Sequence, residues 1–251
     1  MRLANKVAII TGGSRGIGRA IALAFAHEGA KVAVVGRNKN RCDEVVTQIL
    51  KKDGDAISIQ TNVASEADVA KMAEQTKDKF QCIDILVNNA AVNLPYRTVT
   101  ELTLDEWNWV IGINLTGTFL CCRAVLPQMI AQRFGKIINF SSIGGRIGAA
   151  GRTPYRASKA AIINFTECLA AEVKEFDIDV NAICPGIVGT DMIREITGGE
   201  IPANATPPED IAAVAVFLAS DESRAITGTA IDALGHANPL FGVPISVRRA
   251  K

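Results

Sequence analysis

The sequence has few of the residues from which metal sites and disulfide frameworks are built. It contains two histidines, His27 and His236, and six scattered cysteines with no C-x-x-C pair among 251 residues. Zinc sites need closely spaced Cys and His ligands, and disulfide frameworks occur in short, cysteine-dense chains. The adjacent Cys121 and Cys122 fall in an apolar, helical stretch, which favours buried thiols over a redox pair. We therefore expect no metal site and no disulfide framework.

Long apolar runs and an excess of charge are also missing. No stretch approaches the roughly 20 consecutive apolar residues that span a bilayer, and the longest apolar run, 211–219, suits a buried helix. The N-terminus enters a strand pattern at once, which leaves no room for a signal peptide. A net charge of +1 gives no overall field for nucleic acid or a membrane surface. We expect a cytoplasmic protein whose partners are small molecules and copies of itself.

Short β-rich runs alternate with helical patterns along most of the chain. Strands are expected at 6–10, 31–35, 56–60, 83–87, 135–140, 179–183 and 229–232. Helices are expected at 16–28, 39–52, 65–80, 105–133, 155–176 and 208–219. Several strands are continuously apolar, as strands covered on both faces are. The pattern predicts an α/β fold with one domain over residues 1–251, a Rossmann-like, doubly wound parallel sheet of about seven strands with helices on both faces.

Two loop-rich stretches interrupt this alternation. Residues 141–154 are rich in glycine, and residues 185–209 contain four prolines and four glycines. Both follow strands, and ligands of open α/β sheets bind beyond the carboxyl ends of the strands. We interpret the segment near 187–208 as a mobile substrate lid. Residues 236–251 form a tail that either covers a subunit interface or is partly disordered.

A glycine-rich turn directly follows the first predicted strand and precedes the first helix. It reads T-G-x-x-x-G-x-G from Thr11 to Gly18. The glycines permit a tight turn, and the backbone N–H groups and the helix N-terminus favour a pyrophosphate. This position between strand and helix favours dinucleotide binding over a plain turn. The cofactor-binding residues expected here are Gly12, Ser14, Arg15, Gly16, Ile17 and Gly18.

The end of the second predicted strand indicates which dinucleotide is bound. Proteins that bind NAD usually have an acidic residue there, which accepts hydrogen bonds from the adenosine ribose. This sequence has Arg37 at that point, followed by Asn38. Arg37 and Arg15 would suit a ribose 2′-phosphate, because guanidinium groups make planar, charge-assisted contacts. The sequence predicts NADP(H) as the cofactor, and the alternative is that both arginines are simply solvated.

Tyr155 and Lys159 begin the expected helix 155–176 and share one of its faces, since residues four apart are neighbours. A phenol has a reference pKa of about 10. A neighbouring ammonium group favours the phenolate and lowers this pKa. We therefore expect Tyr155 to exchange a proton with a substrate oxygen while Lys159 tunes it. The Y-x-x-x-K pattern alone occurs by chance in many helices.

Several motifs occur together and in a fixed order. They are the T-G-x-x-x-G-x-G turn, N-N-A at 88–90, S-S at 141–142, Y-x-x-x-K at 155–159 and P-G at 185–186. With these motifs the sequence resembles the single-domain branch of the short-chain dehydrogenase/reductase superfamily from residue 6 to about residue 235. The resemblance implies an oxidoreductase that reduces a ketone or aldehyde with NADP(H), reversibly. It also implies a homotetramer, with a dimer as the alternative.

The resemblance assigns roles to residues by position. Its catalytic set is Asn114, Ser142, Tyr155 and Lys159, in which Ser142 holds the substrate oxygen and Asn114 positions a water for proton relay. Tyr155 is the general acid/base in this set. Further cofactor contacts implied by the resemblance are Asn62, Val63, Asn89, Ala90, Tyr155, Lys159, Pro185, Gly186, Val188 and Thr190. Asn88 would either line the cofactor site or brace the sheet.

The substrate is less well determined. The chain is similar to 3-oxoacyl-acyl-carrier-protein reductases, and Arg133 fits a position that holds the acidic carrier, but Phe176 stands where another basic residue is expected. Three arginines around the catalytic loop would attract an anionic substrate or form surface ion pairs, Arg146, Arg152 and Arg156. The short lid predicts an open pocket that accepts bulky carbonyl compounds. The alternatives to a ketone or aldehyde reductase are therefore an acyl-carrier reductase and a non-catalytic, cofactor-binding regulator.

Overall fold

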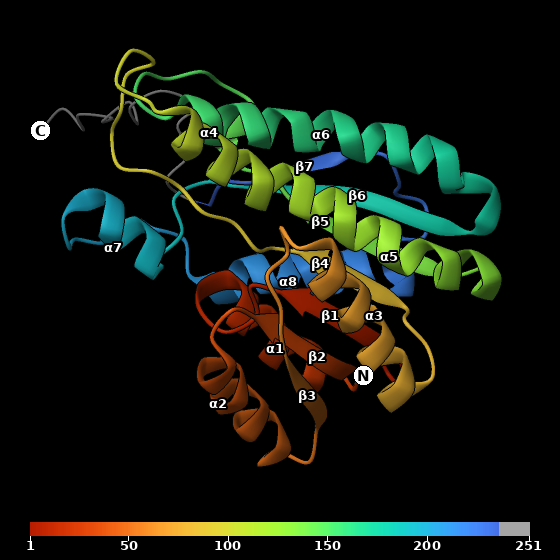
Figure 1. Ribbon diagram of the computed structural model, residues 1–251. Helices are drawn as coiled ribbons and strands as arrows, with labels where there is room; N and C mark the ends of the chain where they lie inside the picture. The colour runs from red at the N-terminus through yellow and green to blue at the C-terminus, as the bar shows by residue number, and fades with distance from the viewer. Residues whose placement is uncertain (236–251) are drawn as a thin grey trace, which may run out of the picture.

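The computed structural model describes residues 1–235, apart from the side chains of Ile196 and Thr197. The predicted C-terminal tail, residues 236–251, lies outside the described part of the chain. Seven strands form one parallel sheet in the order β3-β2-β1-β4-β5-β6-β7 (Figure 1). The strand order reverses between β1 and β4, which is where ligands of doubly wound sheets bind. The predicted fold class is confirmed.

The strands agree closely with those expected from apolar runs. They are β1 (Val7–Thr11), β2 (Lys31–Gly36), β3 (Asp55–Gln60), β4 (Ile85–Asn88), β5 (Gly135–Phe140), β6 (Ile178–Pro185) and β7 (Ala230–Ala233). Every residue of β1, β4 and β5 is buried, because helices cover both faces of the sheet. In the register, Ile9 lies opposite Ala33 on one side and Leu86 on the other.

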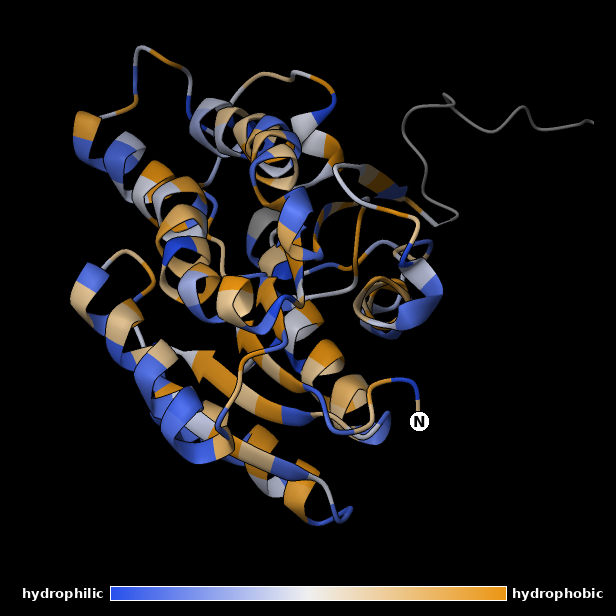
Figure 2. Ribbon diagram, turned by 90° about the vertical axis from the view of Figure 1, so that its right-hand side faces the viewer, coloured by the Kyte–Doolittle hydropathy of each residue, from blue (hydrophilic) through white to orange (hydrophobic). Residues whose placement is uncertain are grey.

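Two hydrophobic clusters, one on each face, hold the helices against the sheet. The first contains residues of α1 (Gly16–His27), α2 (Lys39–Leu50) and α8 (Pro208–Ala219). The second contains residues of α3 (Glu66–Phe80), α5 (Gly117–Gln132) and α6 (Thr153–Val173). Figure 2 shows apolar residues along the central strands and mixed apolar and polar residues around the helices. Alternate strand residues belong to alternate clusters, as Ile9 and Ile10 do.

The helix predicted at 105–133 is divided in the structure. It consists of α4 (Leu104–Ile111), a π-helical turn η1 (Gly112–Thr116) and α5. Single π-helical turns often occur at functional sites, and this one contains Asn114. The stretch Leu104–Gln132 is long and apolar enough to cross a membrane by length and composition, and half of its most apolar window is buried. Core helices of globular proteins pass the same test, so this stretch alone does not indicate a membrane protein.

The predicted lid contains a helix that the sequence analysis missed, α7 (Asp191–Thr197). The many glycines and prolines around it favour a loop, but Gly198 in a left-handed conformation ends this short helix instead of preventing it. The two ends of the segment are tied together. The backbone N–H of Thr206 donates to the Ile187 carbonyl at 2.8 Å, and that of Gly189 donates to the Thr206 carbonyl at 3.0 Å.

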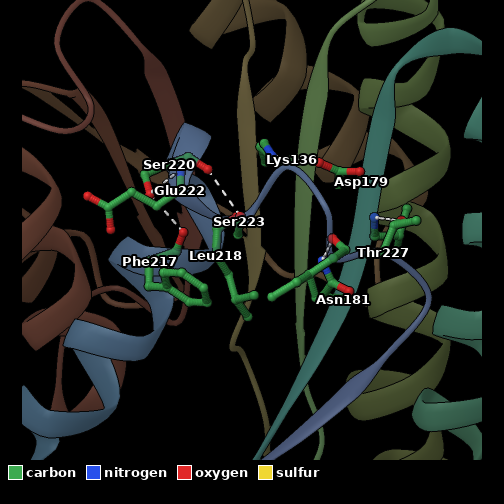
Figure 3. Close-up of polar contacts among 11 residues, drawn as sticks. Lys136, Asp179, Asn181, Phe217, Leu218, Ser220, Glu222, Ser223 and Thr227 are labelled. Atoms are coloured by element: carbon green, nitrogen blue, oxygen red, sulfur yellow. Dashed lines mark hydrogen bonds and ion pairs between the residues drawn. The ribbon is translucent and has the colours of Figure 1, made fainter.

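Polar contacts fasten the last strand to the edge of the sheet (Figure 3). Asn181 on β6 donates to the Ile226 carbonyl at 2.8 Å, and the hydroxyl of Thr227 accepts from the Val180 backbone N–H at 3.1 Å. The Ser223 hydroxyl donates to the Leu218 carbonyl at 2.9 Å and so closes the end of α8. These bonds fix the connection between α8 and β7. This connection lies at the amino ends of the strands, opposite the phosphate turn.

The cysteines are free, as expected from their spacing, and four of the six are buried. Cys121 and Cys122 lie inside α5, and burial raises the pKa of Cys121 to about 12. A thiol with so high a pKa forms almost no thiolate at neutral pH. The prediction that this pair of thiols is buried is confirmed.

Candidate active site

A cavity of about 770 Å³ lies at the carboxyl ends of the first strands. It is bounded by the phosphate turn, the loops after β2, β3 and β4, and the start of α7. Twelve predicted cofactor residues line it: Gly12, Ser14, Arg15, Gly16, Ile17, Arg37, Asn38, Asn62, Val63, Asn89, Ala90 and Thr190. The structure therefore brings together residues from five separate segments of the chain in one elongated space.

Backbone conformation and close packing explain why two positions of the phosphate turn, Gly12 and Gly18, are glycine. Gly12 has a φ of 62°, in the left-handed region that favours glycine. A Cβ atom on Gly18 would lie 2.2 Å from the Gly12 carbonyl oxygen and 2.5 Å from the Asn89 amide nitrogen. Asn89 in turn donates to the carbonyls of Thr11 and Gly12 at 3.1 and 3.2 Å. The loop after β4 thus holds the turn open toward the cavity.

The remaining predicted cofactor residues do not line this cavity. Two of them have a structural role: Gly18 packs against the phosphate turn, and Val188 is buried and forms an isolated β-bridge with Thr206. The other four are Tyr155, Lys159, Pro185 and Gly186. A contact between these residues and a cofactor stays a prediction.

The lining of the cavity next to α2 is basic. Arg15 and Arg37 line it, together with Lys39 and Arg41 at the start of α2, which the sequence analysis missed. Their signal was present in the run K-N-R directly after Asn38, but helix-surface charges rarely indicate a site. Asn38 uses its side-chain oxygen to accept from the Arg41 backbone N–H at 3.1 Å and so caps α2. Lys39 already pairs with Asp43 at 2.6 Å, and the three arginines suit a ligand with an extra phosphate.

Arg15 already has a partner in the structure. Its guanidinium lies 3.1 Å from the carboxylate of Glu195 on α7. Both side chains are exposed, so the pair is weak and readily exchanged for a stronger anion. Arg37 is exposed as well. The lid helix thus contacts the phosphate turn directly, and Gly16 lies against Thr190 at the start of this helix.

Ser142, Tyr155 and Lys159 come together beyond the end of β5. Ser142 follows this strand, and its hydroxyl accepts from the Gly144 backbone N–H at 3.0 Å. Tyr155 lies in the first turn of α6, close enough to Ser142 for the serine side chain to lower the pKa of the phenol. Lys159 is buried one turn later, with its ammonium nitrogen 5.7 Å from the centre of the Tyr155 ring. The predicted face of the helix is confirmed.

The pKa of Tyr155 differs from the expectation. Burial raises it, and this outweighs the opposite effects of the Ser142 hydrogen bond and of the charges on Arg152 and Arg156. Lys159 is not among the groups that shift it; its ammonium donates to the Phe140 carbonyl at 2.6 Å, and burial lowers its own pKa to about 8. The tyrosine pKa is therefore raised where the sequence analysis expected it to be lowered, and the tuning of Tyr155 by Lys159 stays a prediction. Desolvation affects both groups more than their mutual charge.

Asn114 is held by three hydrogen bonds. Its side-chain oxygen accepts from the Val92 backbone N–H at 2.8 Å, and its amide donates to the Val92 carbonyl at 3.0 Å and the Ser158 hydroxyl at 3.1 Å. It thus clamps the loop after β4 to the catalytic helix α6. Its predicted role in a proton relay stays a prediction. Asn88 braces the sheet, because it donates to the Asn139 side chain at 2.9 Å.

The arginines around the catalytic loop differ in what they contact. Arg146 lies 2.9 Å from Asp232 and donates to the Ala230 carbonyl, and so ties the loop to β7. Arg156 donates to the Ile147 carbonyl. Arg133 lies just before β5, at the opposite end of the strands from Tyr155, and donates to the Glu175 carbonyl at 2.7 Å. Within one subunit Arg133 is therefore far from the catalytic loop that it was expected to serve.

The fold and the site define a class, a Rossmann-type α/β oxidoreductase. Residues 6–200 match the family model described as short chain dehydrogenase. The chain is 41% identical to a 3-oxoacyl-[acyl-carrier-protein] reductase of Synechocystis sp., over 90% of this chain and 94% of the relative. It is 40% identical to the uncharacterized oxidoreductase YxbG of Bacillus subtilis, over 93% and 91%.

Solved structures agree with these relatives. The fold superposes on levodione reductase with a TM-score of 0.88 at 29% identity, covering 92% of this chain and 96% of the other. A short-chain type dehydrogenase/reductase from Mycobacterium marinum gives a TM-score of 0.89 at 31% identity, covering 93% and 95%. The chain belongs to the short-chain dehydrogenase family. It is an oxidoreductase that acts on carbonyl or alcohol groups.

Proposed function

We propose that this enzyme reduces a ketone or aldehyde to an alcohol with NADPH, and that Tyr155 is its general acid/base. The observation that carries the proposal is the convergence of the Ser142 and Tyr155 hydroxyls, with Lys159 buried one helical turn away. In this proposal a single domain, residues 1–251, provides the cofactor site and the substrate site, and residues 187–208 cover the substrate.

NADP(H) is the cofactor that the cavity favours. The residues present fit it, because the glycine turn would take a pyrophosphate and three arginines line the same cavity, Arg15, Arg37 and Arg41. When bound, the reduced nicotinamide supplies the hydride. The acidic residue that would hold an unphosphorylated ribose is absent from the end of β2, where Arg37 follows Gly36.

The chemistry of the catalytic residues follows from their surroundings. The raised pKa of Tyr155 keeps its phenol protonated at neutral pH, so it is ready to give a proton to the substrate oxygen. Ser142 offers a hydrogen bond that strengthens as negative charge develops on this oxygen. Lys159 carries a positive charge below its pKa of about 8, and its ammonium group donates to the Phe140 carbonyl.

Two other functions are weaker. A 3-oxoacyl-acyl-carrier-protein reductase is favoured by the names of several relatives, but Arg133 lies at the opposite end of the strands from Tyr155. A non-catalytic regulator would not need the complete set of Asn114, Ser142, Tyr155 and Lys159 that the structure assembles. We further propose a cytoplasmic homotetramer, with a dimer as the alternative, by analogy with the family.

The test is the oxidation of NADPH with a panel of ketones. Replacing Tyr155 by Phe should lower the rate about 10³-fold or more while leaving cofactor binding and thermal stability close to those of the wild type. NADPH should bind more tightly than NADH by roughly 10- to 100-fold, because charge-assisted bonds to the extra phosphate are lost with NADH. A Tyr155→Phe enzyme with unchanged activity would contradict the mechanism, and equal affinity for the two cofactors would contradict the cofactor assignment.

A further inference from the structure

Arg152 lies at the mouth of the proposed catalytic site and differs from the arginines near it. Arg146 is paired with Asp232, and the guanidinium of Arg156 donates to the Ile147 carbonyl. Arg97 pairs with Glu106 at 3.6 Å. Arg152 is partly buried, yet within residues 1–235 its guanidinium makes no hydrogen bond or ion pair. A partly buried cation without a counter-ion is costly, which points to a partner from outside the chain.

The backbone of Arg152 is fixed by both segments that enclose the site. It pairs with Arg97 in an isolated β-bridge, and the Arg97 backbone N–H donates to the Gly151 carbonyl at 2.9 Å. The ring of Tyr96 packs so closely on Gly151 that an added Cβ would lie 2.2 Å from it. On the other side, the Arg152 carbonyl accepts from the Arg156 backbone N–H at 3.0 Å and begins α6. Arg152 therefore has a defined place, three residues before Tyr155.

The charges that act on the tyrosine are both positive. Arg152 and Arg156 each lower the pKa of Tyr155, and no carboxylate acts on it. Apolar side chains lie on the same two segments, since Tyr96 and Ile147 are 61% and 41% exposed. An unpaired guanidinium and exposed apolar side chains thus lie on the segments next to Tyr155, which suits a small organic anion.

We propose that Arg152 binds a carboxylate or phosphate group of the substrate, so that the enzyme prefers anionic carbonyl compounds to neutral ones. This inference rests on the proposed function and names its substrate class. The planar fork of a guanidinium matches both oxyanions in a bidentate manner. Because Arg152 lies three residues from Tyr155, the anionic group lies only a few bonds from the carbonyl that is reduced. The guanidinium of Arg156 already donates to the Ile147 carbonyl. Arg156 therefore adds positive charge to the site but does not form a second bidentate contact with the anion.

The experiment compares ketones that differ only in charge. The wild type and Arg152→Gln are assayed with acetoacetate and with its neutral methyl ester, using NADPH and NADH. The wild type should have the higher kcat/KM with acetoacetate. Arg152→Gln should lose roughly 10- to 100-fold with acetoacetate, mainly through KM, and less than about threefold with the ester. Arg152→Lys should restore part of the loss. Dihydroxyacetone phosphate and dihydroxyacetone form a second pair, which distinguishes phosphate from carboxylate.

Matched controls separate this role from others. Arg224→Gln removes an exposed arginine before β7, at the other end of the strands, and should change neither substrate. If Arg152 only tuned Tyr155, its loss would shift the pH profiles of both ketones equally, and the inference would be overturned. A wild type that prefers the esters and neutral ketones would overturn it too and leave the proposed function intact. A wild type that reduces no ketone with either cofactor would contradict the proposed function and this inference together.

Discussion

At the scale of single residues, burial decides the properties of the catalytic groups. Tyr155 and Lys159 lie on one helix face, but the surrounding protein shifts the pKa of each toward its neutral form. A protonated phenol is the form that reduction requires, so burial serves the proposed direction of the reaction. The phenolate needed for alcohol oxidation should form only at higher pH, and the oxidation rate should therefore rise with pH more than the reduction rate.

The buried ammonium of Lys159 gives a prediction about stability. Its pKa is lowered in the folded protein from 10.5 to about 8, so the folded state binds fewer protons than the unfolded state between these values. Stability rises with pH wherever the unfolded state binds more protons. Relative to Lys159→Met, the cofactor-free wild type should thus gain up to about 3 kcal/mol between pH 8 and pH 10.5. Urea unfolding of both proteins across this range measures the difference.

Below pH 8 the stability difference between these two proteins should stay constant, because Lys159 is then charged in both states. The lost hydrogen bond to the Phe140 carbonyl contributes a term that does not vary with pH. A difference that is flat from pH 6 to pH 10 would show that the ammonium is not desolvated, and the account of the site would need revision.

At the scale of elements, the phosphate turn depends on close contact between α1 and the loop after β4. Gly18→Ala would place a Cβ 2.2 Å from the Gly12 carbonyl oxygen, and backbone must move to relieve this contact. We expect a loss of about 1–3 kcal/mol in the free energy of unfolding and weaker cofactor binding. Chemical denaturation and a fluorescence titration with NADPH measure the two effects.

Gly112 provides the matched control for this substitution. It lies at the start of the π-helical turn η1, and an added Cβ would meet nothing within 4 Å. Gly112→Ala should therefore be neutral or stabilise by up to about 1 kcal/mol, because alanine has the higher helix propensity. If both alanine variants lost the same stability, close packing at Gly18 could not be the cause.

At the scale of the whole molecule, α4 and α5 present large apolar side chains to solvent. Leu104, Trp109 and Phe119 are 72%, 42% and 43% exposed. Exposed apolar patches of this kind often mark subunit interfaces. If the proposed tetramer uses this face, Phe119→Glu should lower the mass measured by light scattering to that of a smaller species. Leu50→Glu changes an equally exposed residue on α2 and should leave the mass unchanged. An unaltered mass for Phe119→Glu would place the interface elsewhere.

The sequence alone predicted the strands, the sheet class and the catalytic helix, because these depend on local patterns. Apolar runs specified strands β1 to β7 within a few residues, and the four-residue spacing of Tyr155 and Lys159 specified a shared helix face. The break in the long helix at η1 was not predicted, since a π-helical turn carries no hydrophobic period of its own. Helix α7 was missed because its glycine-rich flanks resemble a loop.

Contacts between distant segments were decided only by the tertiary structure. Two examples are contacts between residues far apart in the sequence: Arg15 pairs with Glu195, and Asn114 accepts from the Val92 backbone N–H. A third is the guanidinium of Arg152, which has no partner within residues 1–235. The same holds for the pKa of Tyr155, because desolvation depends on all the atoms packed around a group. Hydrophobic periodicity and motif order depend on residues that are close in the sequence. Burial and charge pairing depend on contacts that form only when the chain folds.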